Sequence, residues 1–162
     1  VCDNLRIRRC RLYRDEAFRG YCASKRRYFY GLRVHLLVTA TGLPVEFVLA
    51  PGASHDSAVF RTFDLDLPEE STIYADKGYN DYGYEEILQD TGVELLPLRK
   101  TNSKRPHPPW VTFLLQHARK RVETSFSRIT DLFPKSIHAV TARGFELKIA
   151  CFILAFSFLT AF

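Results

Sequence analysis

The chain has 162 residues, enough for one domain with a substantial core, and its 46% hydrophobic and 25% charged residues are ordinary for a globular protein. Its four cysteines contain no CxxC pair and no histidine spacing suited to zinc, which argues against a disulfide scaffold or a zinc module. The net charge of +5 is segregated: residues 1–33 carry +7, residues 34–98 carry −10 and residues 99–128 carry +7. This pattern predicts a phosphate-binding rim around a carboxylate-rich centre, although two solvated faces would give the same counts.

The first half of the chain is predicted to form strands. The first thirty residues have no clean period and indicate irregular structure with short strands. The runs "YFYGLRVHLLVTA" (residues 28–40) and "LPVEFVLAPG" (residues 43–52) are rich in β-branched and aromatic residues and predict a hairpin that turns at Thr41 and Gly42. A short helix is expected next, with Ser54 or Asp56 as its N-cap.

Strands and helices are then expected to alternate. "STIYADKGY" predicts a brief strand that ends at Asp76, and "NDYGYEEILQDTG" predicts a helix that stops at Gly92. "VELLPLRK" predicts another strand, which leads through a basic, proline-punctuated loop to a helix that begins near Trp110.

Two helices complete the chain. One apolar stripe with steps of three and four residues marks the first of them: Val111, Leu115, Ala118, Val122, Phe126 and Ile129. The last helix is expected over residues 142–160 and to be buried on most sides, since the apolar tail from Ile149 is shorter than the ~20 residues that span a bilayer. The element order therefore predicts an α/β layered fold with a mixed sheet and no membrane segment.

Two acidic residues stand out as candidates for chemistry. Asp76 ends a short strand, where side chains of α/β sheets face functional crevices, and Glu123 is the single acid in the basic segment 99–128. Carboxylates that converge repel each other, and divalent ions such as Mg²⁺ relieve that repulsion. Structural roles are equally compatible with the pattern: Glu123 pairing with Arg119 along a helix, and Asp76 beginning a turn beside Gly78.

Several phrases carry a family resemblance. "YFYGLRVHLLVTATGLPVEFVLAPG", "YADKGYND", "LLPLRKTNSKRP", "RKRVETSFSRI" and "IHAVTARGFELK" together resemble the DDE transposases of bacterial insertion sequences, most closely the nine-eighty-two group. The resemblance implies a ribonuclease-H-like fold in a cytoplasmic bacterial protein. It also implies an Asp-Asp-Glu triad with two Mg²⁺ or Mn²⁺ ions, and DNA as the partner of a possible homodimer.

The resemblance places the second aspartate of the triad at Asp76 and the glutamate at Glu123. Related families surround that glutamate with a Tyr-Arg-Glu-Lys signature; here Arg119 is present, whereas Gln116 and Thr130 stand at the tyrosine and lysine positions. In the family the first aspartate lies on an opening strand, ahead of the phrase that matches "VCDNLRIRRC". We therefore expect residues 1–162 to form a single, N-terminally truncated catalytic domain without that aspartate, as the lack of methionine also suggests. Asp3 is the one nearby acid, but it matches another family position.

The basic residues near these acids are the predicted contacts to the DNA backbone: Lys77, Arg99, Lys100, Lys104, Arg105, Arg119, Lys120 and Arg121. Such a truncated chain is expected to bind DNA and to catalyse weakly or not at all. Two other functions fit the same residues, namely a ribonuclease-H-like nuclease that cleaves without joining, and a non-enzymatic basic module that binds nucleic acid.

Overall fold

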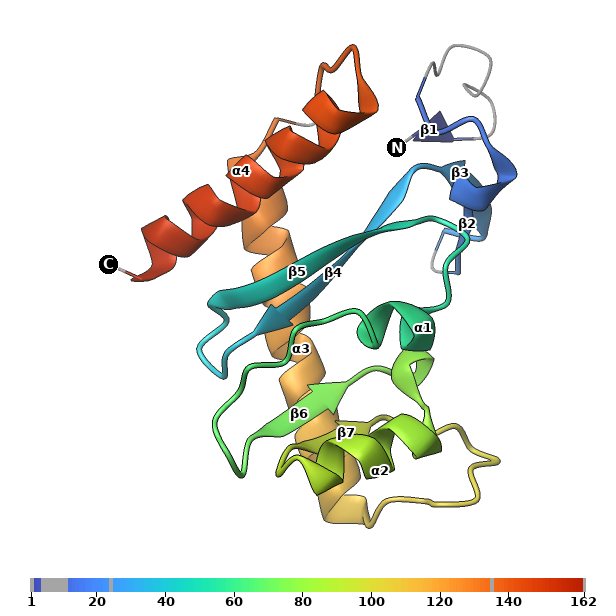
Figure 1. Ribbon diagram of the computed structural model, residues 1–162, viewed down its shortest axis with the longest axis vertical. Coiled ribbons are helices and arrows are strands. Elements are labelled where there is room, and N and C mark those ends of the chain that lie inside the picture. Colours follow the sequence, from blue (N-terminus) through green and yellow to red (C-terminus); the bar gives the residue numbers. More distant parts are fainter. Residues whose placement is uncertain (1, 4–11, 24, 135, 162) are drawn as a thin grey trace.

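The computed structural model describes residues 2–3, 12–23, 25–134 and 136–161. Its strands and helices follow in the order predicted from the sequence (Figure 1). The strands are β1 (Cys2–Asp3), β2 (Arg19–Cys22), β3 (Arg27–Tyr30), β4 (Leu32–Val38), β5 (Pro44–Pro51), β6 (Thr72–Ala75) and β7 (Glu94–Pro97). The α-helices are α1 (Asp56–Phe60), α2 (Tyr82–Asp90), α3 (Pro109–Leu132) and α4 (Ala142–Ala161), and the short 3₁₀ helices are η2 (Glu16–Phe18) and η3 (Lys77–Tyr79).

The strands form three small sheets. β3 lies between β1 and β2 in an antiparallel sheet, β4 and β5 form an antiparallel hairpin, and β6 and β7 form a parallel pair. The predicted mixed α/β composition is therefore confirmed. The single mixed sheet that we expected is not found in the described residues, because no strand pairing links β4 to β6. Among the described strands, each of these two has one edge without a partner.

The predicted hairpin is confirmed, with one correction. Its turn is closed by hydrogen bonds from the Gly42 N–H to the Thr39 carbonyl and from the Thr39 N–H to the Leu43 carbonyl, both 2.9 Å long. The first strand does not begin at Tyr28, however, because Gly31 adopts a φ of 152° and separates β3 from β4. The Gly31 N–H donates to the Phe18 carbonyl, so the break is set by a contact to an earlier segment.

The N-cap predicted for α1 is also corrected. The residue before the helix is His55, whose side chain makes no capping hydrogen bond, and Asp56 is the first helical residue. Asp56 instead accepts a 2.9 Å hydrogen bond from Arg33 of β4. An aspartate that the sequence predicts as a local cap therefore holds α1 to the hairpin.

The main core lies between β6, β7, α1 and α2. Its buried side chains are Phe60, Phe63, Ile73, Leu88, Val93 and Leu95. A second buried group consists of Leu98, Val111 and Leu115, and it attaches the first half of α3 to the end of β7.

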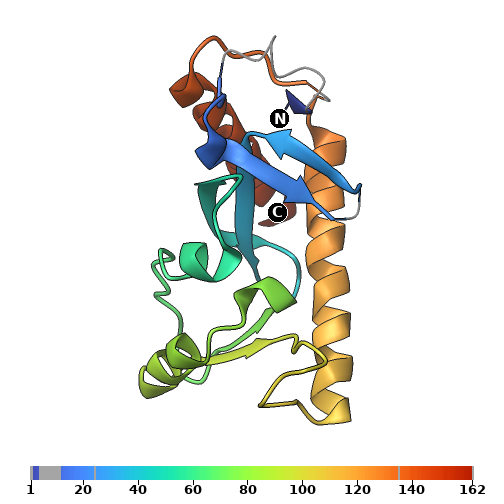
Figure 2. The same cartoon turned by 90° about the vertical axis from the view of Figure 1, so that its right-hand side faces the viewer.

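Helix α3 runs along one side of the molecule, past both two-stranded sheets (Figure 2). Val111, Leu115 and Ile129 of the predicted stripe are buried, and Ala118, Val122 and Phe126 are partly buried. Ser125, which is 3% exposed, donates a 3.0 Å hydrogen bond from its hydroxyl to the Gly42 carbonyl at the hairpin turn. This contact fixes the hairpin turn two residues along the helix from Glu123.

Helix α4 has the predicted bounds to within one residue, but its predicted burial on most sides is wrong. Ile153 and Phe156 are its two buried residues, whereas Leu147, Leu154 and Phe158 on the opposite side are more than half exposed. The helix packs through one face only, with Phe152 stacked on Phe133 at 4.3 Å between ring centroids. By length and composition alone, this helix of 20 residues is also long and apolar enough to cross a membrane.

Candidate active site

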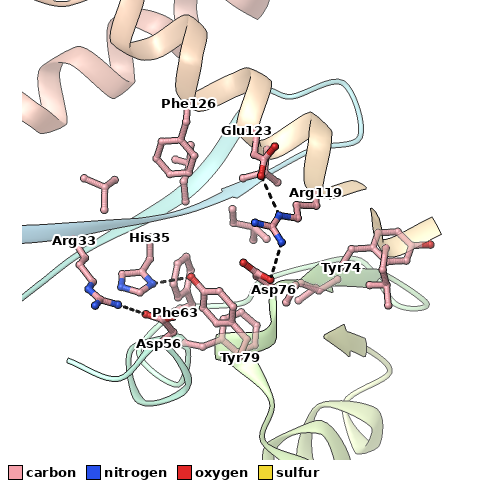
Figure 3. A pocket seen from close by; sticks show the side chains of 18 residues that line it. Arg33, His35, Asp56, Phe63, Tyr74, Asp76, Tyr79, Arg119, Glu123 and Phe126 are labelled. Carbon is pink, nitrogen blue, oxygen red and sulfur yellow. Dashed lines mark hydrogen bonds and ion pairs between the residues drawn. The ribbon is translucent and has the colours of Figure 1, made fainter. Parts of the chain in front are cut away.

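A cavity of about 460 Å³ lies between β4, β6 and α3, and both predicted acids line it (Figure 3). Asp76 follows the last residue of β6, at the carboxyl end of the parallel pair. Its Oδ1 accepts a 2.7 Å hydrogen bond from the Lys77 N–H and caps η3. The proposed turn role of Asp76 is therefore present, and the same turn directs its carboxylate toward α3.

Glu123 reaches the cavity from the edge of α3, and Arg119 connects it to Asp76. The Arg119 Nε donates to the Glu123 Oε1 at 3.0 Å, and the Arg119 Nη1 lies 3.7 Å from the Asp76 Oδ1. Because the rigid guanidinium joins these atoms, the two carboxylates are no more than about 9 Å apart. The helical ion pair that we weighed as a structural role is thus part of a three-residue cluster. All three side chains are 49–63% exposed and open to a ligand.

The other end of the cavity holds a third carboxylate that sequence reasoning treated as a cap. Asp56 pairs there with Arg33, and a Cβ on Gly78 would lie only 2.2 Å from the Asp56 Oδ2. Glycine at position 78 is therefore needed for η3 to pass this close to Asp56. In the sequence, Gly78 stood out because it lies close to Asp76. That pattern did not indicate that Asp56 is the residue beside Gly78 in the fold.

His35 and Tyr79 form the buried wall of this end. The His35 Nδ1 lies 2.8 Å from the Tyr79 hydroxyl, and His35 as a whole residue is 4% exposed. Burial lowers the pKa of His35, so the ring is neutral at neutral pH. Burial also raises the pKa of Tyr79, with the nearby Asp56 and Asp76 adding to the shift, so its hydroxyl keeps its proton. Neither group supplies charge to the cavity at neutral pH.

Of the eight basic residues predicted to contact DNA, three form an ion pair with a described residue and five do not. Arg99 donates two 2.6 Å hydrogen bonds to Glu85, and both side chains are about 90% buried. Arg105 pairs with Glu86 at the surface, and Arg119 belongs to the cluster above. The remaining five are exposed and have no ion pair with another described residue: Lys77, Lys100, Lys104, Lys120 and Arg121. Of the eight, these five are both exposed and without an ion pair to a described residue, and so are accessible to a phosphate.

The donor atoms of the cluster suit a hard divalent ion. Asp76 and Glu123 offer carboxylate oxygens, which Mg²⁺ and Mn²⁺ prefer over nitrogen or sulfur. Within the described residues no group of three or more His, Cys, Asp or Glu side chains lies close enough to hold an ion. Asp3 lies in β1 and pairs with Phe29, and its side chain is outside what the structure describes. The structure therefore provides two carboxylate ligands beside one cavity, those of Asp76 and Glu123. Further oxygen ligands would come from water, phosphate or another segment.

Comparison with known proteins identifies a family for nearly the whole chain. A family model described as the transposase DDE domain matches residues 3–157. No curated protein and no solved structure matches the chain. The match extends from β1 to the last helix and includes every residue of the cluster described above.

Proposed function

Since the family model covers residues 3–157, the chain belongs to the transposase DDE domain family, and we propose that it is the catalytic portion of a bacterial insertion-sequence transposase, of the nine-eighty-two group, that cleaves and rejoins DNA. The observation that carries this proposal is the meeting of Asp76 and Glu123 on one cavity through Arg119. Fold alone would not support an activity, because one fold hosts many chemistries. The convergence of two acids 47 residues apart in the sequence supports this one.

Asp76 and Glu123 are the proposed ligands of divalent metal, Mg²⁺ or Mn²⁺, at a site for two ions. When bound, such ions activate water or a DNA 3′-hydroxyl and stabilise the charge that develops on the phosphodiester. Two unit charges 9 Å apart repel by about 2 kcal/mol at an effective dielectric of 20, and by more as they approach, so a cation between the acids is favourable. Arg119 supplies that positive charge in the structure.

DNA is proposed to cross the cavity with its backbone held by the accessible cations. Lys77 lies directly beside Asp76, and Lys120 and Arg121 lie within one turn of Glu123 on α3. If Asp76 and Glu123 held a metal ion, the Arg119 guanidinium would be free to bind a phosphate. Arg99 has a different role in this proposal: its buried pair with Glu85 holds α2 to the segment after β7.

The ribonuclease-H-like mixed sheet is proposed to require one more strand between β4 and β6. The cavity of about 460 Å³ and a second of about 480 Å³ share lining from both strands and from Val122 of α3. Together they make a slot with an unpaired strand edge on each side, which suits an extended segment. A strand there would join the hairpin and the parallel pair into one sheet, and we propose this slot as the place of the opening strand on which the family resemblance puts the first aspartate.

Titration of Mn²⁺ into the purified 162-residue chain tests the metal site. Binding is expected to be lost in Asp76→Asn and in Glu123→Gln, and to be kept in Asp131→Asn, which removes an exposed acid from the far end of α3. Binding that survives both substitutions would contradict the ligand assignment and favour a non-enzymatic basic module.

An activity assay on supercoiled plasmid tests the rest of the proposal. Because the described residues place no third acid in the cluster, the chain is expected to bind DNA in a salt-sensitive manner and to nick it weakly. Robust Mg²⁺-dependent cleavage that Glu123→Gln abolishes would refute the claim of an incomplete site. Cleavage without any strand transfer by a chain that also carries the additional strand would favour the nuclease.

A further inference from the structure

Helix α3 has a second apolar face, which is exposed and adjoins its buried stripe. Trp110 is 66% exposed, Phe113 67% and Leu114 43%, and His117 lies one turn beyond them. The Phe113 and His117 rings are stacked, with 6.5 Å between centroids and 26° between planes. The exposed side of a surface helix is normally polar, so a row of exposed rings indicates a ligand.

The charge around these rings points to the class of that ligand. Residues 99–122 contain no acid, and Lys120 and Arg121 continue the same helix face beyond His117. Lys100 and Lys104 lie exposed in the loop that leads into the helix. Proteins that bind single-stranded nucleic acid combine these two features, with aromatic rings that stack on bases and cations that follow the backbone. The exposed apolar side of α4, by contrast, has no such run of cations from Leu147 to Phe158 apart from Lys148.

We propose that this face of α3 binds unpaired DNA bases. Phe113 and Trp110 stack on the bases, and Lys120 and Arg121 hold the adjoining phosphates. Phe113 precedes Glu123 by ten residues, or about 15 Å along a helix, so a strand freed at the acidic cluster reaches the rings within a few nucleotides. The inference rests on the proposed function, since strand cleavage at the cluster is what releases an end.

The single tryptophan of the chain makes the first measurement direct, because all tryptophan emission comes from Trp110. The probes are a twelve-nucleotide oligothymidine and an abasic strand with the same number of phosphates. The base-containing strand is expected to quench the emission at saturation, and the abasic strand to leave it unchanged. Equal quenching by both strands would overturn the proposal, because phosphates alone would then account for binding.

Two matched variants test the contribution of stacking. Phe113→Ala and Phe158→Ala each remove a ring that is 67% exposed, the first from this face and the second from α4. Measured by anisotropy of labelled oligothymidine, Phe113→Ala is expected to weaken binding about 5- to 150-fold and Phe158→Ala to have no effect. Equal affinities of both variants for oligothymidine would refute base stacking.

The outcomes also separate this inference from the function on which it rests. If the chain binds no DNA of either kind, the proposed function fails together with the inference. If it binds both strands equally, DNA binding stands and only the stacking face is refuted. If sedimentation shows that Phe113→Ala converts a dimer into monomers, while oligothymidine binding is unchanged, the face is an interface between copies and the proposal is wrong.

Discussion

Replacing Arg119 by glutamine is expected to raise the affinity of the chain for Mn²⁺. In the structure the guanidinium lies 3.0 Å from the Glu123 Oε1 and 3.7 Å from the Asp76 Oδ1, so it occupies the position between the acids that an ion requires. Both pairs are about half exposed, and exposed pairs of this kind contribute about 0.2–1 kcal/mol each. Loss of both corresponds to about 0.4–2 kcal/mol, or a 2- to 30-fold gain in affinity.

Calorimetric titration at low ionic strength is the suitable assay, because salt screens interactions between exposed charges. Lys120→Gln is the control, since it removes an equal charge from the neighbouring residue without an ion pair to either acid. If Lys120→Gln raised the affinity for Mn²⁺ by a comparable factor, the change in net charge alone would explain the effect. A loss of affinity in Arg119→Gln would refute the reasoning, because the guanidinium would then position the carboxylates rather than compete with metal.

Three further predictions concern stability and are checked by urea denaturation. Gly78→Ala brings a Cβ within 2.2 Å of the Asp56 carboxylate and is expected to lower the free energy of unfolding by about 1–3 kcal/mol. Gly83→Ala, where the nearest atom lies at 3.8 Å, should not destabilise the fold. Equal losses of stability in the two variants would contradict the crowding at Gly78. Arg99→Ala leaves a buried glutamate without its partner and is expected to cost about 3–5 kcal/mol, while Arg105→Ala, at the surface, should leave the free energy of unfolding unchanged. Burial lowers the pKa of His35 below 6.5. As the pH falls, the imidazole therefore takes up a proton at a higher pH in the unfolded chain than in the folded chain. The free energy of unfolding should therefore decrease below pH 6.5, by at most about 1.4 kcal/mol per pH unit, and the decrease should be smaller in His35→Gln.

The sequence predicted the elements well because their signals are local. Runs of β-branched and aromatic residues mark β4 and β5, and a helical period marks α3, each within a few residues; Gly42 and Gly92 mark turns that need a positive φ, which is 89° and 80° in the structure. Asp76 and Glu123 were selected from local patterns and the family resemblance. Their meeting at Arg119 follows from where β6 ends against α3, which local patterns do not report.

The features that sequence reasoning missed all depend on a distant partner. Gly31 breaks a strand because its N–H donates to Phe18, and Arg99 is buried because Glu85, 14 residues earlier, reaches it from α2. Charge counts treated Arg99 like any other cation of its segment. The exposed side of α4 was missed for a related reason. An apolar composition indicates that a helix tends to be buried, but it does not show which of its faces pack against another element.

The slot between β4 and β6 predicts a characteristic pattern of amide hydrogen exchange. In an antiparallel pair, alternate residues of β4 direct their N–H groups toward β5, and the residues between them direct theirs into the slot. Amides of the first kind should exchange slowly and those of the second kind quickly, so protection along residues 32–37, before the register shift at Val38, should alternate residue by residue. A strand that enters the slot would protect both kinds, and the loss of alternation would report its arrival without any change in the hairpin itself.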